Sequence, residues 1–335
     1  MKGILLVNLG TPDSTSVKDV RKYLREFLMD KRVIDIPFWK RWLLINLIIV
    51  PFRGPKSAKE YAKLFDERGS PLKYYSVSIT EKLQAKLGDN YKVILGMRYQ
   101  SPSLASALDE LKNCESIHVI PLFPQYASAS TGSVQDKVME LMKDWQIIPD
   151  VTFTSKFFEE KLFLQTIVDR ARKLMSEDEY DHFVFSYHGL PERQITKGAI
   201  DNHCQFGSCC GVYDDKNQYC YRAQCFENSR LLAQLLELNK DQYSVTFQSR
   251  LGKTPWIRPY TDEVLKTLPA NGIKKVLAFS PAFVSDCLET TVEVGQQFRD
   301  EFIEAGGEKW TLVPSLNEEG TWVECLEGMV KKIAE

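Results

Sequence analysis

Short runs of β-branched and apolar residues alternate along the chain with longer segments whose apolar positions recur at helical spacing. The short runs predict strands and the longer segments predict amphipathic helices. Strict alternation of the two is typical of parallel sheets covered by helices on both faces. The expected strands are 3–8, 91–97, 116–121, 149–153, 182–187, 243–248, 273–279 and 309–313, and the expected helices are 16–28, 57–66, 74–87, 103–112, 131–144, 158–175, 220–237, 259–268, 286–304 and 320–333.

The expected strands divide into two sets of four, with a break near residues 154–160. We therefore predict an α/β fold of two doubly wound domains, 1–155 and 156–335, each a four-stranded parallel sheet flanked by helices. The last helix could pack on either half. In such sheets, ligands and catalytic groups gather at the carboxyl ends of the strands.

Composition narrows the class of protein. A net charge of −2 over 335 residues gives no basic field, so nucleic acid is not an expected partner. The start of the chain does not resemble a signal peptide, and no apolar run approaches the ~20 residues of a membrane span, so we expect a cytoplasmic protein. The eight cysteines are then expected as reduced thiols or metal ligands rather than disulfides.

His188 lies where an apolar strand meets a Gly and Pro turn, which is the carboxyl end of that strand. Imidazole can take protons or bind a transition metal near neutral pH, although a histidine at a strand end can equally be a hydrogen-bonded structural residue. Glu289 also follows a strand of the second half, so both side chains should open on the same sheet edge. Together they form a sparse nitrogen and oxygen pair suited to holding a divalent metal loosely.

Acidic and amide side chains form a stripe at helical spacing after the strand 273–279. Two interpretations are open: a solvated face on a surface helix, or a row of carboxylates that binds a cation or relays protons. The stripe comprises Asp286, Glu289, Glu293, Gln297 and Asp300.

Five of the eight cysteines fall within one short segment, beside His203. That density favours a metal centre, either an iron–sulfur cluster on four thiolates or a zinc site. Two of the thiols are adjacent in sequence and cannot easily bind a single metal ion together. The candidates, of which four are expected to be ligands, are Cys204, Cys209, Cys210, Cys220 and Cys225.

A further group of aromatic and basic residues stands at strand ends or in the loops that follow. Each residue alone could be an ordinary core residue, but together they would suit a flat hydrophobic ligand that carries carboxylates. The group comprises Arg98, Tyr99, Tyr126, Trp256 and Phe283.

These residues lie in segments that resemble ferrochelatases. The two signature segments are 186–191 (SYHGLP) and 285–290 (SDCLET). Further matches run in order along nearly the whole chain, and the sequence around 248–250 and 287–290 is most similar to the Gram-negative bacterial branch. They are 6–12 (LVNLGTP), 69–72 (GSPL), 96–99 (GMRY), 124–133 (PQYASASTGS), 246–252 (TFQSRLG) and 255–256 (PW).

The resemblance implies insertion of Fe²⁺ into protoporphyrin IX, with release of two pyrrole protons, by two Rossmann-like domains with the porphyrin cleft between them. The alternatives are a coproporphyrin III ferrochelatase, a chelatase for another tetrapyrrole and metal, and a non-catalytic porphyrin or iron–sulfur binding protein, against which the intact His188 and Glu289 argue. His188 is then base, iron ligand or both, and Glu289 helps to bind the metal or pass protons. Glu293 continues the stripe, whereas Gln297 replaces a carboxylate that several family members carry.

The resemblance also assigns the surroundings of that site. The porphyrin contacts would be Leu9, Arg98, Tyr99, Tyr126, Trp256 and Phe283. The segment 37–53 matches an apolar lip; with Lys40, Arg41 and Arg53 beside paired tryptophans it suits peripheral contact with the inner membrane, although it could instead be a buried helix. Residues 200–217 look like an insertion that would carry a [2Fe–2S] cluster or Zn²⁺. The sequence leaves monomer or dimer open, and we favour a monomer.

Overall fold

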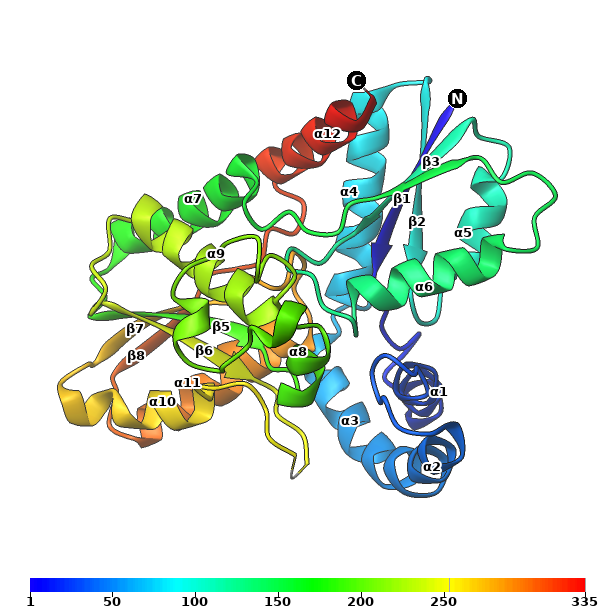
Figure 1. The fold of residues 1–335 in the computed structure, drawn as a ribbon. Helices are drawn as coiled ribbons and strands as arrows, with labels where there is room; N and C mark the ends of the chain where they lie inside the picture. Colours follow the sequence, from blue (N-terminus) through cyan, green and yellow to red (C-terminus); the bar gives the residue numbers. More distant parts are fainter. Residues whose placement is uncertain (253, 335) are drawn as a thin grey trace. The chain divides into compact units, whose positions relative to one another are not determined.

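The computed structural model describes residues 1–252 and 254–334, and its chain divides into two compact units. Unit 1 comprises Met1–Phe123, Ala127–Lys156 and Asn317–Glu335, and unit 2 comprises Pro124–Tyr126 and Phe157–Leu316. The chain therefore contributes the short segment Pro124–Tyr126 to unit 2 and then returns to unit 1. It builds the rest of unit 2 from Phe157 to Leu316 and returns to unit 1 for its last helix (Figure 1).

Each unit is built on a four-stranded sheet in which every paired neighbour is parallel. The strand orders are β2-β1-β3-β4 and β6-β5-β7-β8, so the two sheets share one topology. The α/β fold and all of the predicted strands are confirmed. Their bounds are β1 Lys2–Asn8, β2 Tyr91–Met97, β3 Ser116–Pro121, β4 Asp150–Phe153, β5 His182–His188, β6 Tyr243–Gln248, β7 Lys275–Phe279 and β8 Lys309–Leu312.

In unit 1 the helices are α1 Val17–Leu28, α2 Phe38–Leu43, α3 Val50–Leu64, α4 Pro71–Leu87, α5 Leu104–Leu111, α6 Thr131–Met142 and α12 Gly320–Ala334, with a π-helical segment η1 at Leu44–Ile49. In unit 2 they are α7 Lys161–Glu177, α8 Glu192–Lys197, α9 Tyr221–Leu235, α10 Thr261–Thr267 and α11 Phe298–Glu304, with a π-helix η5 at Leu288–Gln297 and the short 3₁₀ turns η2 Ile200–Asn202, η3 Ser208–Cys210 and η4 Pro269–Asn271. Helix α8 was not predicted, because a six-residue helix carries too little periodicity to stand out.

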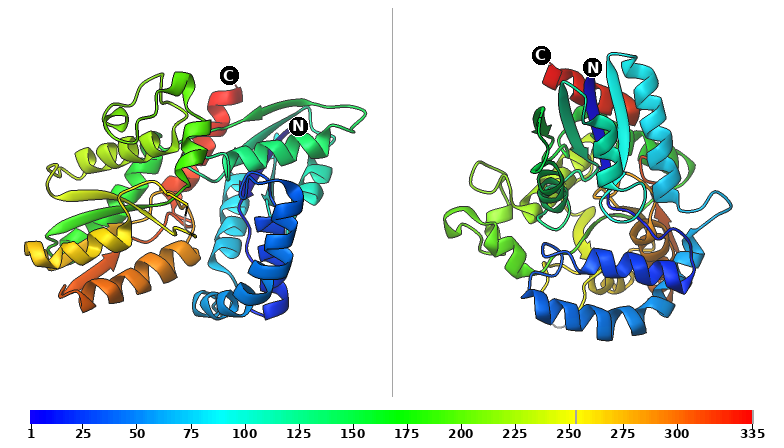
Figure 2. Two further views of the ribbon diagram at one scale, coloured as in Figure 1. Left: turned by 60° about the horizontal axis from the view of Figure 1, so that its bottom comes forward. Right: turned by 90° about the vertical axis from the view of Figure 1, so that its right-hand side faces the viewer.

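Nearly every position along the central strands β1 and β5 is buried, so both faces of each sheet are covered. In unit 1, Leu5 and Val7 of β1 pack with residues of α5 and α6, while α4 and α12 lie on the opposite side (Figures 1 and 2). In unit 2, Val184 of β5 shares a buried cluster with Val294 and Phe298. The π-helix is therefore anchored to the sheet by its apolar face, which leaves its other face for the carboxylates.

Helix α12, whose packing the sequence left open, belongs to unit 1. Glu318, two residues before the helix, pairs with Lys82 of α4 at 3.0 Å, and Lys86 lies 3.5 Å from Glu324. The segment 37–53 is almost entirely helical. The helix runs without a break from Phe38 through the π-helical turn η1 into α3, beside α1 (Figure 2). The helix predicted at 57–66 thus begins well before its predicted start.

Candidate active site

The carboxyl end of β5 places the imidazole of His188 and fixes its tautomer. His188 is the last residue of β5 and pairs in register with Gln248 of β6. Its Nδ1 lies 2.6 Å from the carbonyl oxygen of Gly189. A carbonyl can only accept a hydrogen bond, so Nδ1 carries the proton and the lone pair of the neutral ring is on Nε2. That atom can accept a proton or coordinate a metal.

Glycine is required directly after His188 because the chain folds tightly against β6. The Gly189 N–H donates to the Gln248 carbonyl at 2.8 Å. A Cβ at Gly189 would lie 2.8 Å from that same oxygen and 3.2 Å from the ring of Trp256. The indole centroid of Trp256 is 6.5 Å from that of His188, so the loop carrying Trp256 packs beside the histidine.

The π-helix η5 brings two carboxylates to the same edge of the sheet. Glu293 accepts hydrogen bonds from the Ser249 N–H at 3.0 Å, from the Ser249 hydroxyl, and from Gln248 Nε2 at 3.2 Å. Gln248 Nε2 also donates to the backbone carbonyl of Glu289 at 2.9 Å. Since Gln248 pairs with His188, one amide side chain ties the helix to the strand that ends in the histidine.

Burial is the main influence on the acidity of Glu293. Loss of hydration raises the pKa of its carboxyl above the usual range, and the negative charge of Glu289 adds to the rise. The Ser249 hydrogen bond and the positive form of His188 act in the opposite direction. Glu293 and His188 therefore sense each other's charge, which is the arrangement expected of two groups that share a proton path.

A buried chain of hydroxyls orients Gln248. Ser186 donates to Gln248 Oε1 at 2.6 Å, Ser186 and Thr261 lie 2.9 Å apart, and Thr261 donates to Thr246 at 3.0 Å. With its oxygen held by Ser186, the amide must turn its Nε2 toward the π-helix. Our sequence reasoning missed Gln248 and Ser249 as functional residues, although both lie in a matched segment.

The aromatic residues expected to contact porphyrin are divided between the units. Tyr126, Trp256 and Phe283 belong to unit 2 and are each partly exposed, so their side chains have surface to offer a ligand. Leu9 of unit 1, just after β1, is also partly exposed. These four residues keep the surface that the predicted role needs.

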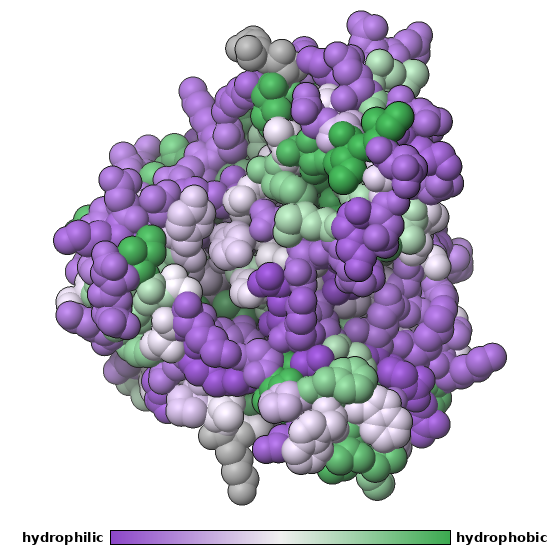
Figure 3. All heavy atoms as spheres, turned by 45° about the vertical axis from the view of Figure 1, so that its right-hand side comes forward, coloured by the Kyte–Doolittle hydropathy of each residue, from purple (hydrophilic) through white to green (hydrophobic). Residues whose placement is uncertain are grey.

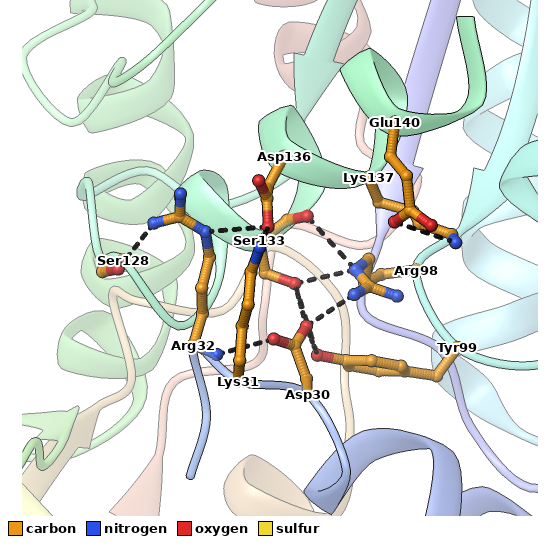
Figure 4. Close-up of polar contacts among 10 residues, drawn as sticks. All are labelled: Asp30, Lys31, Arg32, Arg98, Tyr99, Ser128, Ser133, Asp136, Lys137 and Glu140. Atoms are coloured by element: carbon orange, nitrogen blue, oxygen red, sulfur yellow. Dashed lines mark hydrogen bonds and ion pairs between the residues drawn. The ribbon is translucent and has the colours of Figure 1, made fainter. Parts of the chain in front are cut away.

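Arg98 and Tyr99 form part of a polar cluster in unit 1 (Figure 4). Asp30 accepts from Arg98 at 2.5 Å and from the Tyr99 hydroxyl at 2.9 Å, and Ser133 donates to Asp30 and accepts from Arg98 at 2.7 Å. The prediction that Tyr99 contacts porphyrin is wrong for this structure. Its side chain is 0% exposed and its hydroxyl donates to Asp30, so it helps to hold the carboxylate that pairs with Arg98.

Four of the five clustered cysteines line one small cavity in unit 2, together with His203 and Asn217. The sulfurs of the adjacent Cys209 and Cys210 are 4.0 Å apart. Within the described residues, no three His, Cys, Asp or Glu side chains are already arranged around a common metal position. The four thiols are those of Cys204, Cys209, Cys210 and Cys220.

Cys225 does not belong with the other four. It lies on the inner face of α9, is 0% exposed, and is not part of the cavity lining. Of the five candidates, from which four ligands were predicted, Cys225 is thus the one that does not line the cavity. Both adjacent cysteines take part in the lining instead.

The segment 37–53 presents apolar side chains to solvent, which excludes the buried-helix interpretation. Trp39 is 61% exposed and Phe52 is 79% exposed. Figure 3 shows apolar side chains at the bottom of the view, where Figure 1 places α2 and α3. Arg41 differs from the prediction: it is buried and donates to the carbonyls of Ile34 and Ile36, so it closes the turn before α2 and is not an interfacial cation.

No helix among residues 1–252 and 254–334 has both the length and the apolar character that a membrane crossing requires.

Comparison with known proteins places these observations in a family. The family model described as Ferrochelatase matches residues 1–334. The chain is 46% identical over 331 residues to a ferrochelatase of Legionella pneumophila (strain Lens), covering 99% of each chain. It is 44% identical over 337 residues to a ferrochelatase of Coxiella burnetii (strain Dugway 5J108-111), covering 98% of this chain and 93% of the relative.

Among solved structures, SirB from Bacillus subtilis with Fe3+ superposes with a TM-score of 0.54 at 11% identity, covering 99% of this chain and 95% of that one. At that identity the likeness concerns the fold, which is that of a chelatase.

Proposed function

The chain belongs to the ferrochelatase family, close to the Gram-negative enzymes of Legionella and Coxiella, and from that premise we propose that His188 and the carboxylates of η5 insert Fe²⁺ into protoporphyrin IX. The activity itself is that of the family: the enzyme is a lyase that inserts iron into a porphyrin for heme biosynthesis. The observation that carries the assignment of residues is the 2.6 Å contact between His188 Nδ1 and the Gly189 carbonyl, which leaves Nε2 of the neutral ring with the lone pair at the carboxyl end of β5.

Metal insertion requires the two pyrrole N–H bonds to break as the four ring nitrogens bind the iron. A neutral imidazole whose Nδ1 proton is held by Gly189 can take a pyrrole proton on Nε2 without rearranging. The resulting imidazolium keeps its Nδ1 hydrogen bond. His188 is therefore proposed as the proton acceptor, and coordination of iron by the same Nε2 before proton transfer remains compatible with this geometry.

Glu293 is proposed as the next proton carrier. Its raised pKa makes it a better proton acceptor than an exposed carboxylate, and its charge interacts with His188. Glu289, one π-turn nearer the helix start, supplies a carboxylate for Fe²⁺, a hard to borderline cation that oxygen and imidazole ligands suit. The proton would thus reach the helix at Glu293, while the metal stays near Glu289 at its first turn.

The test is anaerobic Fe²⁺ insertion by His188→Ala, followed by loss of free-porphyrin fluorescence. We expect insertion to fall by at least 10²-fold, the lower end of what a positioned base contributes, with porphyrin affinity changed little. His182→Gln, at the other end of β5, is the matched control and should keep its activity. Insertion by His188→Ala at the wild-type rate would refute the role of His188.

Protoporphyrin IX is proposed over coproporphyrin III because the exposed rim at 37–53 is apolar, and protoporphyrin carries fewer carboxylates. The same insertion assay run with both porphyrins distinguishes them by kcat/KM. A higher kcat/KM for coproporphyrin III would overturn the choice.

The apolar lip, defined as residues 37–53, is proposed to bring this cytoplasmic enzyme into reversible contact with the inner membrane. Exposed Trp39, Trp42 and Phe52 with Lys40 and Arg53 nearby are suited to an anionic lipid interface. Trp39→Ser with Trp42→Ser should reduce sedimentation with anionic vesicles several-fold. Ile147→Ser, an equally exposed apolar residue elsewhere in unit 1, should not. Absence of vesicle binding by the wild-type chain would remove the proposal.

The cysteine cavity is proposed to hold a [2Fe–2S] cluster, with Zn²⁺ as the alternative. Four thiols line this cavity, which is the number of ligands that either group takes, and adjacent Cys209 and Cys210 can each serve a different iron, which a single zinc ion does not offer. The absorption spectrum and metal content of anaerobically purified protein decide between them. Cys220→Ser should lose the metal and Cys114→Ser should keep it; a colourless protein with one zinc would exclude the cluster.

A further inference from the structure

The first turn of α9 lies between the cysteine cavity and His188. Cys220 is the residue that precedes the helix and lines the cavity, and Tyr221 is the first residue inside the helix. The Tyr221 hydroxyl donates to the backbone carbonyl of His188 at 2.9 Å. Two neighbouring residues therefore face two different sites, and both sites lie in unit 2.

On the His188 side, the Tyr221 hydrogen bond holds a peptide group on which the tautomer depends. The His188 carbonyl belongs to the His188–Gly189 peptide, and the next carbonyl, that of Gly189, accepts the Nδ1 proton at 2.6 Å. The two peptides share the Gly189 Cα, so a shift of the first peptide that displaces this atom also displaces the carbonyl to which Nδ1 is bonded. Tyr221 is itself buried at 7% exposure, so its hydroxyl has no ready exchange with water.

On the cavity side, α9 is tied to the cysteine segment by buried amide side chains. Asn217, 4% exposed, donates to the carbonyls of Cys209 at 2.9 Å and Val212 at 2.7 Å. The Cys220 N–H donates to the Asn217 carbonyl at 2.8 Å. Gln224, one turn into α9, donates to the Gln218 carbonyl at 2.7 Å. A displacement of the thiols is thus passed to the start of α9 rather than absorbed by a loose loop.

Gln224 extends the connection to a second residue of the proposed site. Its Oε1 accepts from the Tyr126 N–H at 2.7 Å, and Gln224 is 0% exposed. The first turn of α9 therefore bonds to the cysteine segment, to His188 and to the backbone of a proposed porphyrin contact.

We propose that Tyr221 is a positioning residue for His188 and that it transmits the state of the cysteine cavity to the active site. The inference rests on the proposed function for the role of His188. It does not require a metal in the cavity, because any change that moves the Cys220 thiol acts at the same peptide.

The first test compares Tyr221→Phe with wild type by ¹⁵N NMR of labelled histidine, at a pH where the imidazoles are neutral. The His188 signal is assigned by its absence in His188→Ala. We expect wild-type His188 to show the Nδ1–H tautomer and Tyr221→Phe to show a mixture of tautomers. An unchanged tautomer in the variant would overturn the positioning role.

Kinetics provide a second reading of the same variant. Loss of one hydrogen bond should lower kcat about two- to tenfold, with KM for porphyrin nearly unchanged. Tyr213→Phe is the matched control, since Tyr213 also donates to a backbone carbonyl in this segment, that of Gln218 at 3.2 Å. A parallel loss in both variants, or a loss in KM alone, would contradict the proposal.

The transmission is tested by blocking the cavity thiols with methyl methanethiosulfonate, a small reagent that dithiothreitol removes. After modification of Cys220, confirmed by mass spectrometry, the wild-type His188 signal should shift toward the mixed tautomer and return on reduction. In Tyr221→Phe the same modification should change the signal little. No shift in wild type, or an equal shift in both proteins, would refute the route through Tyr221. Because the readout is spectroscopic, failure of His188 as the insertion base would be seen separately in the His188→Ala assay.

Discussion

Replacing Asp30 by alanine should destabilise unit 1 far more than removing any exposed carboxylate near it. The Asp30 side chain is 4% exposed and accepts hydrogen bonds from Arg98, Tyr99 and Ser133 (Figure 4). The Arg98 side chain is itself 13% exposed, so its guanidinium would lose its anion while remaining mostly out of water. Removing one partner of a buried pair costs about 3–5 kcal/mol, chiefly because the remaining charge is unpaired.

Asp136 provides the control from the same part of the structure. Its carboxylate lies 3.0 Å from Lys31 and 3.3 Å from Arg32, but its side chain is 31% exposed and that of Lys31 is 67% exposed. Exposed pairs contribute about 0–1 kcal/mol, since water and salt screen them. Asp136→Ala should therefore cost at least ~2 kcal/mol less than Asp30→Ala, although Asp136 forms two ion pairs and Asp30 forms one.

The assay is urea-dependent hydrogen exchange read by mass spectrometry, with peptides of β1 to β3 reporting on unit 1 and peptides of β5 to β7 on unit 2. Separate reporting is needed because a chain of two units need not unfold in one step. The double variant Asp30→Ala with Arg98→Met should recover part of the loss, because no unpaired charge then remains. Equal losses for the Asp30 and Asp136 variants, or no recovery in the double variant, would show that burial of the pair is not what matters.

Three further outcomes follow from the geometry. Gly189→Ala should lower the free energy of unfolding by about 1–3 kcal/mol and reduce iron insertion, because the new Cβ would meet the Gln248 carbonyl. Gly198→Ala should leave the thermal melt unchanged, since the nearest atom to its new Cβ would be 3.7 Å away. Burial lowers the pKa of His118 to about 4, so wild-type unit 1 should lose stability as the pH falls from 6.5 toward 4, and His118→Asn should remove that slope in exchange measurements. The raised pKa of Glu293 has the opposite effect on the pH dependence of stability. The free energy that Glu293 contributes to folding is fully present below pH 4.5 and is lost as the pH rises through the folded pKa, so Glu293→Gln should reduce this loss of stability in unit 2.

The strands and the sheet edge were predictable because they depend on local patterns and on one rule of topology. Runs of β-branched residues are long enough to identify each strand, and parallel strands bring their carboxyl ends to one edge. His188 and Glu289 could be paired on that basis without knowledge of any contact. Gln248 could not, because a glutamine at a strand end has no distinctive chemistry until its register partner is known.

The errors share a physical cause, which is that local sequence does not show whether a side chain faces the core. Tyr99 was assigned to the ligand site by its neighbours in sequence, and its side chain is fully buried. Arg41 stands among exposed residues of the lip and yet turns inward to two backbone carbonyls. A polar or aromatic residue beside a functional one is as well suited to supporting it as to contacting a ligand, and tertiary packing decides which.

Burial and hydrogen bonding, rather than helical spacing, explain why the predicted stripe of side chains does not act as one row. A π-helix closes its hydrogen bonds five residues apart, so residues four apart, such as Glu289, Glu293 and Gln297, stay on one side of it. Glu293 turns toward Ser249 and is largely withdrawn from water, whereas Gln297 is exposed and donates to Glu301 at 3.0 Å. The amide at Gln297 therefore does not interrupt a buried relay, because the buried part of the row already ends at Glu293. A proton that reaches Glu293 next meets the Ser249 hydroxyl, and β6, rather than the following turn of the helix, supplies the next polar group on its path.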